Sequence, residues 1–341
     1  MATNSVSAPK KTSVFQKIAR YPYLGLIIGL ILILVVAWFL TPKMFTYDGI
    51  ISMFRNNSIY AILTAGMMLV LITGGIDLSV ASILAMTGIF TSKLTATFPD
   101  VPGFVWLIVG LLIGAIAGLI NGLMIGKLRI IPFIATLGTM YIYRGLAFVV
   151  SGGKWFFPQV YGESYTWWAT GTLIPTIPNL VLIVVVVLVL VGLFLGYTKS
   201  GRRVYAIGTS RESSHVAGIK DGNVELMVYT INGALCGMAG MLYTANYVLG
   251  YYGMADSFEM TAIAICILGG VSITGGRGRM DGVVISILIM SVIYNFTSML
   301  PGLSVWQKAI QGAIIIVAVF VNVASGKLSD KRALKERGAL I

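Results

Sequence analysis

The first residues with chemical potential form the segment GGIDLSV (74–80), which interrupts a long apolar stretch. Asp77 is an ionisable side chain at a depth where a charge is expensive, and such residues usually have a role. The two glycines can break a helix, and Asp77 and Ser79 could cap a helix that starts at Leu78. Three roles stay open for Asp77 at this point: shaping and capping the loop, contacting a polar cargo, or binding a proton or ion.

Asparagines also lie inside other apolar stretches, at Asn121, Asn232, Asn246 and Asn295. An asparagine in a membrane helix usually bonds to a neighbouring helix, and contact with a cargo is the alternative. The candidate residues of a substrate pathway are Gly74, Gly75, Asp77, Ser79, Asn121, Asn232 and Asn295.

A second polar region is the loop 198–224. Thr209 and Glu212 have the spacing of a capping box, which predicts a short helix from about Ser210 to Ala217. Gly218 should end this helix, because glycine accepts the left-handed conformation. Such a helix is either a docking element for a soluble partner or an ordinary interfacial helix. The candidate residues for coupling to such a partner, called the candidate coupling residues, are Gly201, Gly208, Thr209, Ser210, Glu212, His215, Ala217 and Gly218.

Catalytic, metal and nucleotide sites are not indicated. Gly196 and Gly201 have phosphate-loop spacing, but Arg202 and Arg203 stand where Lys and Ser or Thr should follow. Cys236 and Cys266, the two cysteines, lie in apolar segments without metal-ligand spacing. We therefore expect no catalytic residues, no metal site and no cofactor in this chain, and any ATP must be bound by another polypeptide.

The elements that must position these residues are membrane helices. Hydrophobic residues make up 57% of the 341 residues and charged ones 11%, against about 25% charged in soluble domains. This composition excludes a soluble enzyme and a disordered chain. Uncharged stretches predict an all-α, polytopic membrane protein with about ten spans, centred near residues 31, 65, 86, 114, 140, 187, 237, 267, 290 and 316. The third span is short, so the range is eight to ten.

Charge predicts the orientation and the domain limits. The net charge is +12, and the basic residues lie between apolar runs, which indicates membrane orientation rather than nucleic-acid binding. Most of the 24 Lys and Arg fall on one side if both termini are cytoplasmic. We expect basic cytoplasmic tails at 1–20 and 326–341 around a transmembrane domain at 21–325. The apolar segment 180–195 should contact lipid.

Two further features suggest organisation beyond single spans. The segment 268–282 joins a glycine pair to a polar turn, as 71–82 does, which predicts a weak internal repeat. The loop 151–177 on the outer side is rich in tryptophan and tyrosine. It is either an interfacial belt or a docking surface for an external partner.

Four motifs, in this order, carry a resemblance to a known family: GGIDLSV (74–80), NGLMIGKLRIIPFIATLGTMYIYRGLAF (121–148), TKSGRRVYAIGTSRESSHVAGI (198–219) and AIAICILGGVSITGGRGRMDG (262–282). Together the chain resembles the permease subunits of bacterial ABC importers for simple sugars, such as ribose, arabinose, rhamnose and autoinducer-2. Ala81 departs from the pattern, since glycine is common there.

The resemblance implies translocation of a monosaccharide or similar polyol across the bacterial inner membrane. It also implies three partners: an ATPase with two nucleotide-binding modules docking around 209–219, an external sugar-binding protein, and a second permease subunit in a homodimer or heterodimer. A branched-chain amino-acid permease, an ion-coupled carrier and a membrane enzyme are the alternatives. Few buried ionisable groups argue against ion coupling, and an enzyme lacks a visible catalytic set.

Overall fold

The structure is a computed structural model that describes residues 23–300, 302–310, 312, 313 and 316. Helices dominate this part of the chain. They are α2 (Leu24–Leu40), η1 (Pro42–Phe45), α3 (Tyr47–Ile72), α4 (Val80–Thr97), α5 (Gly103–Gly126), α6 (Pro132–Ser151), η2 (Pro158–Val160), α7 (Glu163–Thr170), α8 (Asn179–Tyr197), α9 (Lys199–Thr209), α10 (Arg211–Val216), α11 (Asp221–Tyr247), α12 (Phe258–Leu268), α13 (Met280–Met299) and η3 (Ser304–Trp306). The predicted all-α class is confirmed.

Seven helices are long and apolar enough to cross a membrane: α3, α4, α5, α6, α8, α11 and α13. The shorter apolar helices are α2 and α12. These nine helices match nine of the ten predicted centres, and the tenth, near residue 316, lies largely outside the described residues. The third predicted span has 18 residues and is long enough to cross. The shortest of the nine is α12, with 11 residues.

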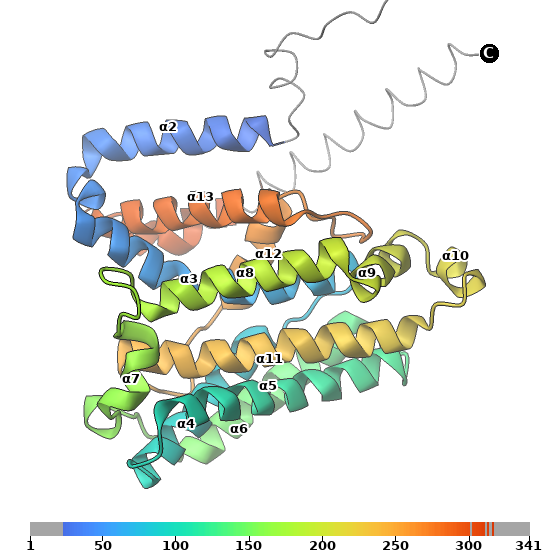
Figure 1. Cartoon of the computed structure of the whole chain (residues 1–341), viewed down its shortest axis with the longest axis horizontal. Helices are drawn as coiled ribbons and strands as arrows, with labels where there is room; N and C mark the ends of the chain where they lie inside the picture. The colour runs from blue at the N-terminus through green and yellow to red at the C-terminus, as the bar shows by residue number, and fades with distance from the viewer. Residues whose placement is uncertain (1–22, 301, 311, 314–315, 317–341) are drawn as a thin grey trace, which may run out of the picture.

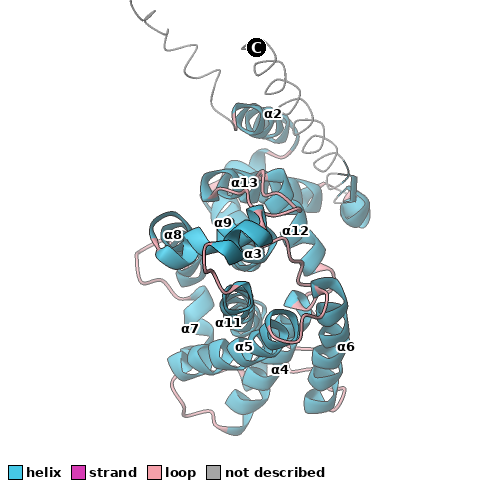
Figure 2. Cartoon of the chain, turned by 90° about the vertical axis from the view of Figure 1, so that its right-hand side faces the viewer, coloured by secondary structure: helices cyan, strands magenta, loops and turns pink. Residues whose placement is uncertain are grey.

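The long helices run roughly side by side, so the molecule has two distinct ends (Figure 1). At one end lies α7, and at the opposite end α9 and α10 project beyond the bundle. Figure 2, viewed from the α9–α10 end, shows α3 between α13 and α11 and places α2 on the outside. The predicted tails at 1–20 and 326–341 lie outside the described residues.

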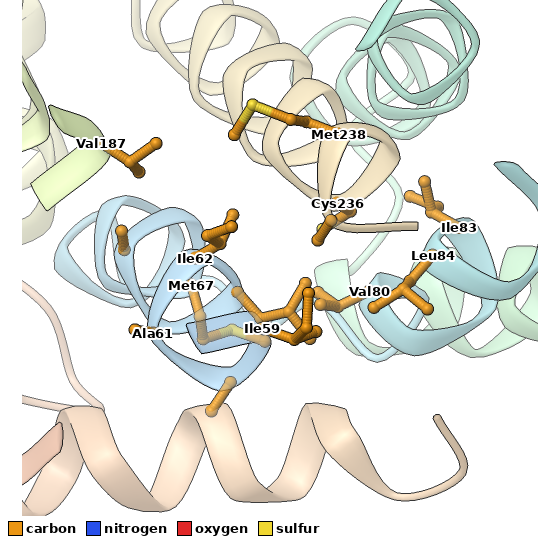
Figure 3. Packing of buried hydrophobic residues seen from close by; sticks show 14 of the residues in the cluster. Ile59, Ala61, Ile62, Met67, Val80, Ile83, Leu84, Val187, Cys236 and Met238 are labelled. Carbon is orange, nitrogen blue, oxygen red and sulfur yellow. The ribbon is translucent and has the colours of Figure 1, made fainter. Parts of the chain in front are cut away.

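The core centres on α3. Its apolar side chains, Ile59 and Ile62 among them, are buried against neighbouring helices, and 83% of its spanning window is buried. Figure 3 shows Ile62 and Met67 of α3 in the same cluster as Cys236 of α11 and Leu84 of α4. In contrast, α8 leaves Val185 and other valines about half exposed. This exposed apolar face fits the predicted lipid contact.

A regular glycine row brings α5 and α11 into direct backbone contact. Glycine recurs at every fourth position of α5, at residues 110, 114, 118, 122 and 126, which places the row on one helix face. A Cβ on Gly118 would overlap the carbonyl oxygen of Tyr229, and one on Gly114 would overlap that of Gly233. Small residues of this kind let membrane helices approach closely. The row fixes α5 against α11 and thereby the positions of Asn121 and Asn232 relative to each other.

Candidate functional site

The loop between α3 and α4 holds a fully buried carboxylate. Gly74 has a φ of +79°, which turns the chain away from the end of α3. The side chain of Asp77 is 0% exposed. Its Oδ1 accepts hydrogen bonds from the backbone N–H of Ser79 (2.9 Å) and from the Ser79 hydroxyl (2.6 Å). The loop therefore folds around its own acid.

Side chains from two distant helices complete this group. Asn232 of α11 donates through Nδ2 to Asp77 Oδ2 at 2.8 Å. Asn121 of α5 donates through Nδ2 to the Ser79 hydroxyl at 2.8 Å. Asp77, Ser79, Asn121 and Asn232, which we call the Asp77 network, are each 0% exposed. Both carboxylate oxygens have partners within the chain, as a charge buried from water requires.

The helix α6 also holds this loop. Thr136 accepts a hydrogen bond from the backbone N–H of Leu78 at 3.1 Å, and its hydroxyl also lies near the Ile76 carbonyl oxygen at 3.3 Å. Tyr143 donates to the Ala117 carbonyl oxygen at 2.9 Å and lies 3.4 Å from Asn121 Oδ1. The loop is thus fastened to α5, α6 and α11. Thr136 and Tyr143 were missed by the sequence reasoning, because nothing marks a threonine or tyrosine in an apolar helix as a loop partner.

The predicted cap on the helix after Asp77 is wrong in detail. The helix begins at Val80 rather than Leu78, and the Ser79 side chain makes no cap hydrogen bond. Its hydroxyl is oriented to the carboxylate instead, because a charged acceptor is the stronger partner. Asn295 also stands apart, since it lies on α13 and belongs to none of the contacts of the Asp77 network.

The loop 198–224 contains two helices where the sequence predicted one. The first, α9, begins at a capping contact in which Thr198 accepts a bond from the Gly201 N–H at 2.9 Å. The second, α10, has Ser210 as its N-cap, with the Ser210 hydroxyl accepting from the Ser213 N–H at 3.2 Å. Thr209 is not the cap, since its hydroxyl donates to the Tyr205 carbonyl oxygen at 2.9 Å. Gly218 has a φ of +76°, as predicted.

The candidate coupling residues fall into three groups: packed residues, exposed residues and residues that line a groove. Gly201 and Gly208 pack closely, and a Cβ on Gly208 would overlap the carbonyl oxygen of Ile72. Glu212, His215 and Gly218 are exposed. Thr209, Ser210 and Ala217 line a groove of about 560 Å³ together with Arg202 and Tyr205. The neighbouring Val216 is 90% exposed.

A charge cluster ties α10 to the bundle. Arg211 of α10 contacts Glu225 of α11 at 2.6 Å, and Glu225 is 2% exposed. Arg129, in the loop between α5 and α6, makes two hydrogen bonds to Asp221 at 2.7 and 2.9 Å. The bond to Asp221 raises the pKa of Arg129. These four residues, the charge cluster, connect the short helix to the ends of α5, α6 and α11. They were not predicted, because their partners are far apart in sequence.

The described ranges hold no group of three His, Cys, Asp or Glu side chains that could bind a metal ion. Cys236 and Cys266 are free and buried. The two candidate sites of the described residues are thus a saturated polar network inside the bundle and an exposed, capped helix at one end.

Comparison with known proteins decides the family. A profile described as "Branched-chain amino acid transport system / permease component" matches residues 49–319. The chain belongs to this family of transport permeases. The ribose import permease RbsC of Bacillus subtilis is 32% identical over 94% of this chain and 98% of its own length. The fructose import permease FruG of Bifidobacterium longum is 33% identical over 94% of this chain and 96% of its own length. The D-allose transport permease AlsC of Escherichia coli is 34% identical over 86% of this chain and 89% of its own length. No solved structure matches this chain.

The permease family is one of transport components rather than enzymes, and its members are multi-pass membrane proteins. The resemblance found in the four motifs is thereby confirmed. In this permease, the motif GGIDLSV forms the loop of the Asp77 network, and the motif 198–219 forms α9, α10 and their groove. Gly208 of the second motif lies against Ile72 at the end of α3, two residues before the first motif.

Proposed function

We propose that this permease is the membrane-spanning subunit of an ATP-binding cassette importer that moves a monosaccharide or similar small polyol inward by alternating access. The observation that carries the proposal is similarity over nearly the whole chain to permeases named for ribose, fructose and allose. The description of the matched family names branched-chain amino acids, whereas these three relatives are named for sugars.

The α9–α10 end is the proposed docking site of the ATPase. The helix α10 projects at this end of the bundle (Figure 1). The groove beside it is open to solvent, and the neighbouring Val216 is exposed. The charge cluster holds α10 to α11, so a push on α10 is transmitted to the bundle rather than absorbed by a loose loop. The partner would carry two nucleotide-binding modules and all of the bound ATP, so this chain itself needs no cofactor.

This docking site sets the orientation that we propose. With α10 in the cytoplasm of a bacterial cell, α7 lies on the outer side of the inner membrane and receives an external sugar-binding protein. Ten spans then place both termini in the cytoplasm, where Lys and Arg are enriched. A second permease subunit, identical or similar, would complete the pathway. The exposed apolar faces of α5 and α6, which include Ile116 and Ile142, are available for that subunit or for lipid.

The test is uptake by the assembled importer in sealed vesicles. The permease is reconstituted with its ATPase and binding protein, and labelled ribose, fructose, allose and leucine are offered with and without ATP. We expect ATP-dependent accumulation of at least one sugar and none of leucine. A vesicle with the permease alone is the control and should accumulate nothing.

Two outcomes would contradict the proposal. Accumulation of leucine instead of sugars would assign the permease to the amino-acid branch of its family. Accumulation by the permease alone, driven by an ion gradient, would make it a secondary carrier. Few ionisable groups are buried among the described spans, and the buried carboxylate Asp77 is already bonded on both oxygens, which is why we do not expect the second outcome.

A further inference from the structure

A cavity of about 230 Å³ adjoins the groove beside α10, and Ile219 lines both. One wall of the cavity comes from α9, where Ser200 and Arg203 are three positions apart and therefore share a helix face. A second wall comes from the first turns of α11, around Asn223, and the linker 218–220 between α10 and α11 forms a third. Three separate segments of the chain thus enclose this cavity.

The cavity is lined by polar groups that can donate hydrogen bonds and that have no acceptor. Arg203 and Lys220 line it, and no acidic residue does. Among the described residues, the side chains of Arg203, Lys220 and Ser200 have no hydrogen-bond or ion-pair partner. Lys127 donates to the Oδ1 of Asn223. This contact occupies the acceptor of the Asn223 amide and leaves its Nδ2 as a further donor.

The acidic residues nearest in the chain are engaged elsewhere. Asp221 follows Lys220, but its carboxylate accepts two hydrogen bonds from Arg129 at 2.7 and 2.9 Å. Glu225 is paired with Arg211 at 2.6 Å. Neither carboxylate lines the cavity. Within the described part of the chain, the positive charge of the cavity is therefore not compensated.

The cavity lies close to the boundary of the membrane. The exposed apolar face of α8, which includes Leu190, leads to Tyr197, which is 80% exposed and ends the helix. Tyrosine is enriched at this boundary, and Ser200 follows only three residues later. With 27 residues, α11 is about 40 Å long and exceeds the hydrocarbon core of about 30 Å. Its charged residues, Asp221 and Glu225, place the projecting part at its start. Figure 1 shows that α8 ends and α11 begins at the same end of the bundle.

A phosphate group matches this set of donors. It is negatively charged, and its oxygens accept hydrogen bonds from several directions, as the walls of α9, α11 and the linker require. Arginine and lysine are the usual protein partners of phosphate. The cavity is smaller than the roughly 300–1,000 Å³ of pockets for drug-sized ligands, so it suits a small anionic group rather than a nucleotide.

We propose that Ser200, Arg203, Lys220 and Asn223 bind a phosphate group, supplied either by the headgroup of an anionic lipid or by a small phosphate compound in the aqueous phase. We call these four residues the phosphate site. A bound phosphate bridges α9 to the start of α11 and stabilises the end of the bundle that carries α10. The phosphate site is distinct from the pathway of the cargo and does not depend on which solute the permease carries.

The first arm of the test uses inorganic phosphate. The purified permease is melted in a non-ionic detergent and titrated with sodium phosphate or, at matched pH and ionic strength, with sodium chloride. We expect phosphate and not chloride to raise the melting temperature, because a ligand that binds only the folded state stabilises it. Arg203→Gln and Lys220→Gln should each raise the apparent Kd for phosphate about fivefold, the fold-change that a net hydrogen bond of about 1 kcal/mol represents. The double variant should lose the shift.

A matched control and an independent variant are available beside the cavity. Lys199 is exposed and adjoins Ser200 in the chain but does not line the cavity. Lys199→Gln removes the same charge as the test variants and should keep the full shift. Asn223→Asp puts a carboxylate at the cavity with almost no change in shape, and Lys127 can still donate to it. This variant should melt like wild type without phosphate and show no shift with it.

The second arm distinguishes the two sources of the phosphate group. The permease is placed in bilayer discs of phosphatidylcholine alone or of an equal mixture with phosphatidylglycerol. If a lipid headgroup fills the site, phosphatidylglycerol raises the melting temperature of wild type and Lys199→Gln more than that of the double variant. If a soluble phosphate fills it, added sodium phosphate raises the melting temperature in both kinds of disc, and phosphatidylglycerol has the same effect on wild type and the double variant.

Two results would overturn the phosphate site. The first is a wild-type melting temperature that neither phosphate in detergent nor phosphatidylglycerol in discs changes. The second is a shift of equal size in wild type, Asn223→Asp and the double variant, which would show a general effect of ions on the protein surface. Both results concern the anion alone, so they are separate from the uptake experiment that tests the proposed function.

Discussion

Replacing Asp77 tests whether the buried acid holds the loop or acts through its charge. Asp77→Ala leaves the Ser79 N–H, the Ser79 hydroxyl and the Asn232 amide without their acceptor in a dry site. Each unsatisfied buried group costs about 1–3 kcal/mol. We therefore expect Asp77→Ala to destabilise the permease by about 3–9 kcal/mol, enough to displace the loop from α11.

Asp77→Asn keeps the shape and one acceptor oxygen. That oxygen can still accept both bonds from Ser79, but the new amide would face the Nδ2 of Asn232, donor against donor. Only one interaction is lost, so the expected cost is about 1–2 kcal/mol. The double variant Asp77→Asn with Asn232→Asp places a carboxylate on α11 opposite an amide in the loop and should recover part of this loss.

The assay is a melting curve of the purified permease in detergent, read beside ATP-dependent uptake by the importer. The expected order of both melting temperature and uptake is wild type, then the double variant, then Asp77→Asn, with Asp77→Ala lowest. If Asp77→Asn melts like wild type but transports as poorly as Asp77→Ala, the charge itself is needed. The hydrogen-bond argument would then be refuted and an ion site favoured.

Three more predictions concern packing and coupling. Gly118→Ala should lower the melting temperature sharply, because its Cβ overlaps the Tyr229 carbonyl oxygen, whereas the control Gly25→Ala meets no atom within 4 Å. Gly218→Pro should abolish co-purification of the ATPase, because proline cannot adopt a φ of +76° and the end of α10 must change. Circular dichroism should show that the spans stay folded. Undiminished recovery of the ATPase would contradict the proposed docking site. Arg211→Ala leaves Glu225 buried without its 2.6 Å partner, so we expect ATPase activity that sugar-loaded binding protein no longer stimulates; normal stimulation would show that the charge cluster does not transmit the signal.

Much of the fold was predictable because membrane helices appear in the sequence as long uncharged, apolar stretches. Uncharged stretches of about 20 residues located nine helices. The length of α12 was not predictable in this way. Its apolar stretch continues toward residue 276, but the helix stops at Leu268, and Gly270 just beyond it has a φ of +82°. The left-handed conformation of a glycine, rather than hydropathy, ends that helix.

The candidate site was predictable as a set of residues and not as an arrangement. Asp77 stood out because a carboxylate among apolar helices is costly. Its partner Asn232 lies 155 residues away, and no local pattern joins the two. The cap of α10 was misplaced by one residue for a related reason. Thr209 and Ser210 are both good caps, and the choice depends on α9, whose last turn engages the Thr209 hydroxyl.

Gly208 connects the proposed docking end of the bundle to the buried loop of Asp77. The Gly276 N–H donates to the Ile72 carbonyl oxygen at 2.9 Å, and Gly208 packs against the same carbonyl. The end of α3 is therefore held between α9 and the turn that precedes α13. Any displacement of α9 must move this carbonyl or break its bond, and Ile72 leads directly into the loop of Asp77. Since that loop is bonded to α5, α6 and α11, a rigid, saturated network serves transmission better than cargo binding, which requires groups that are free to exchange partners.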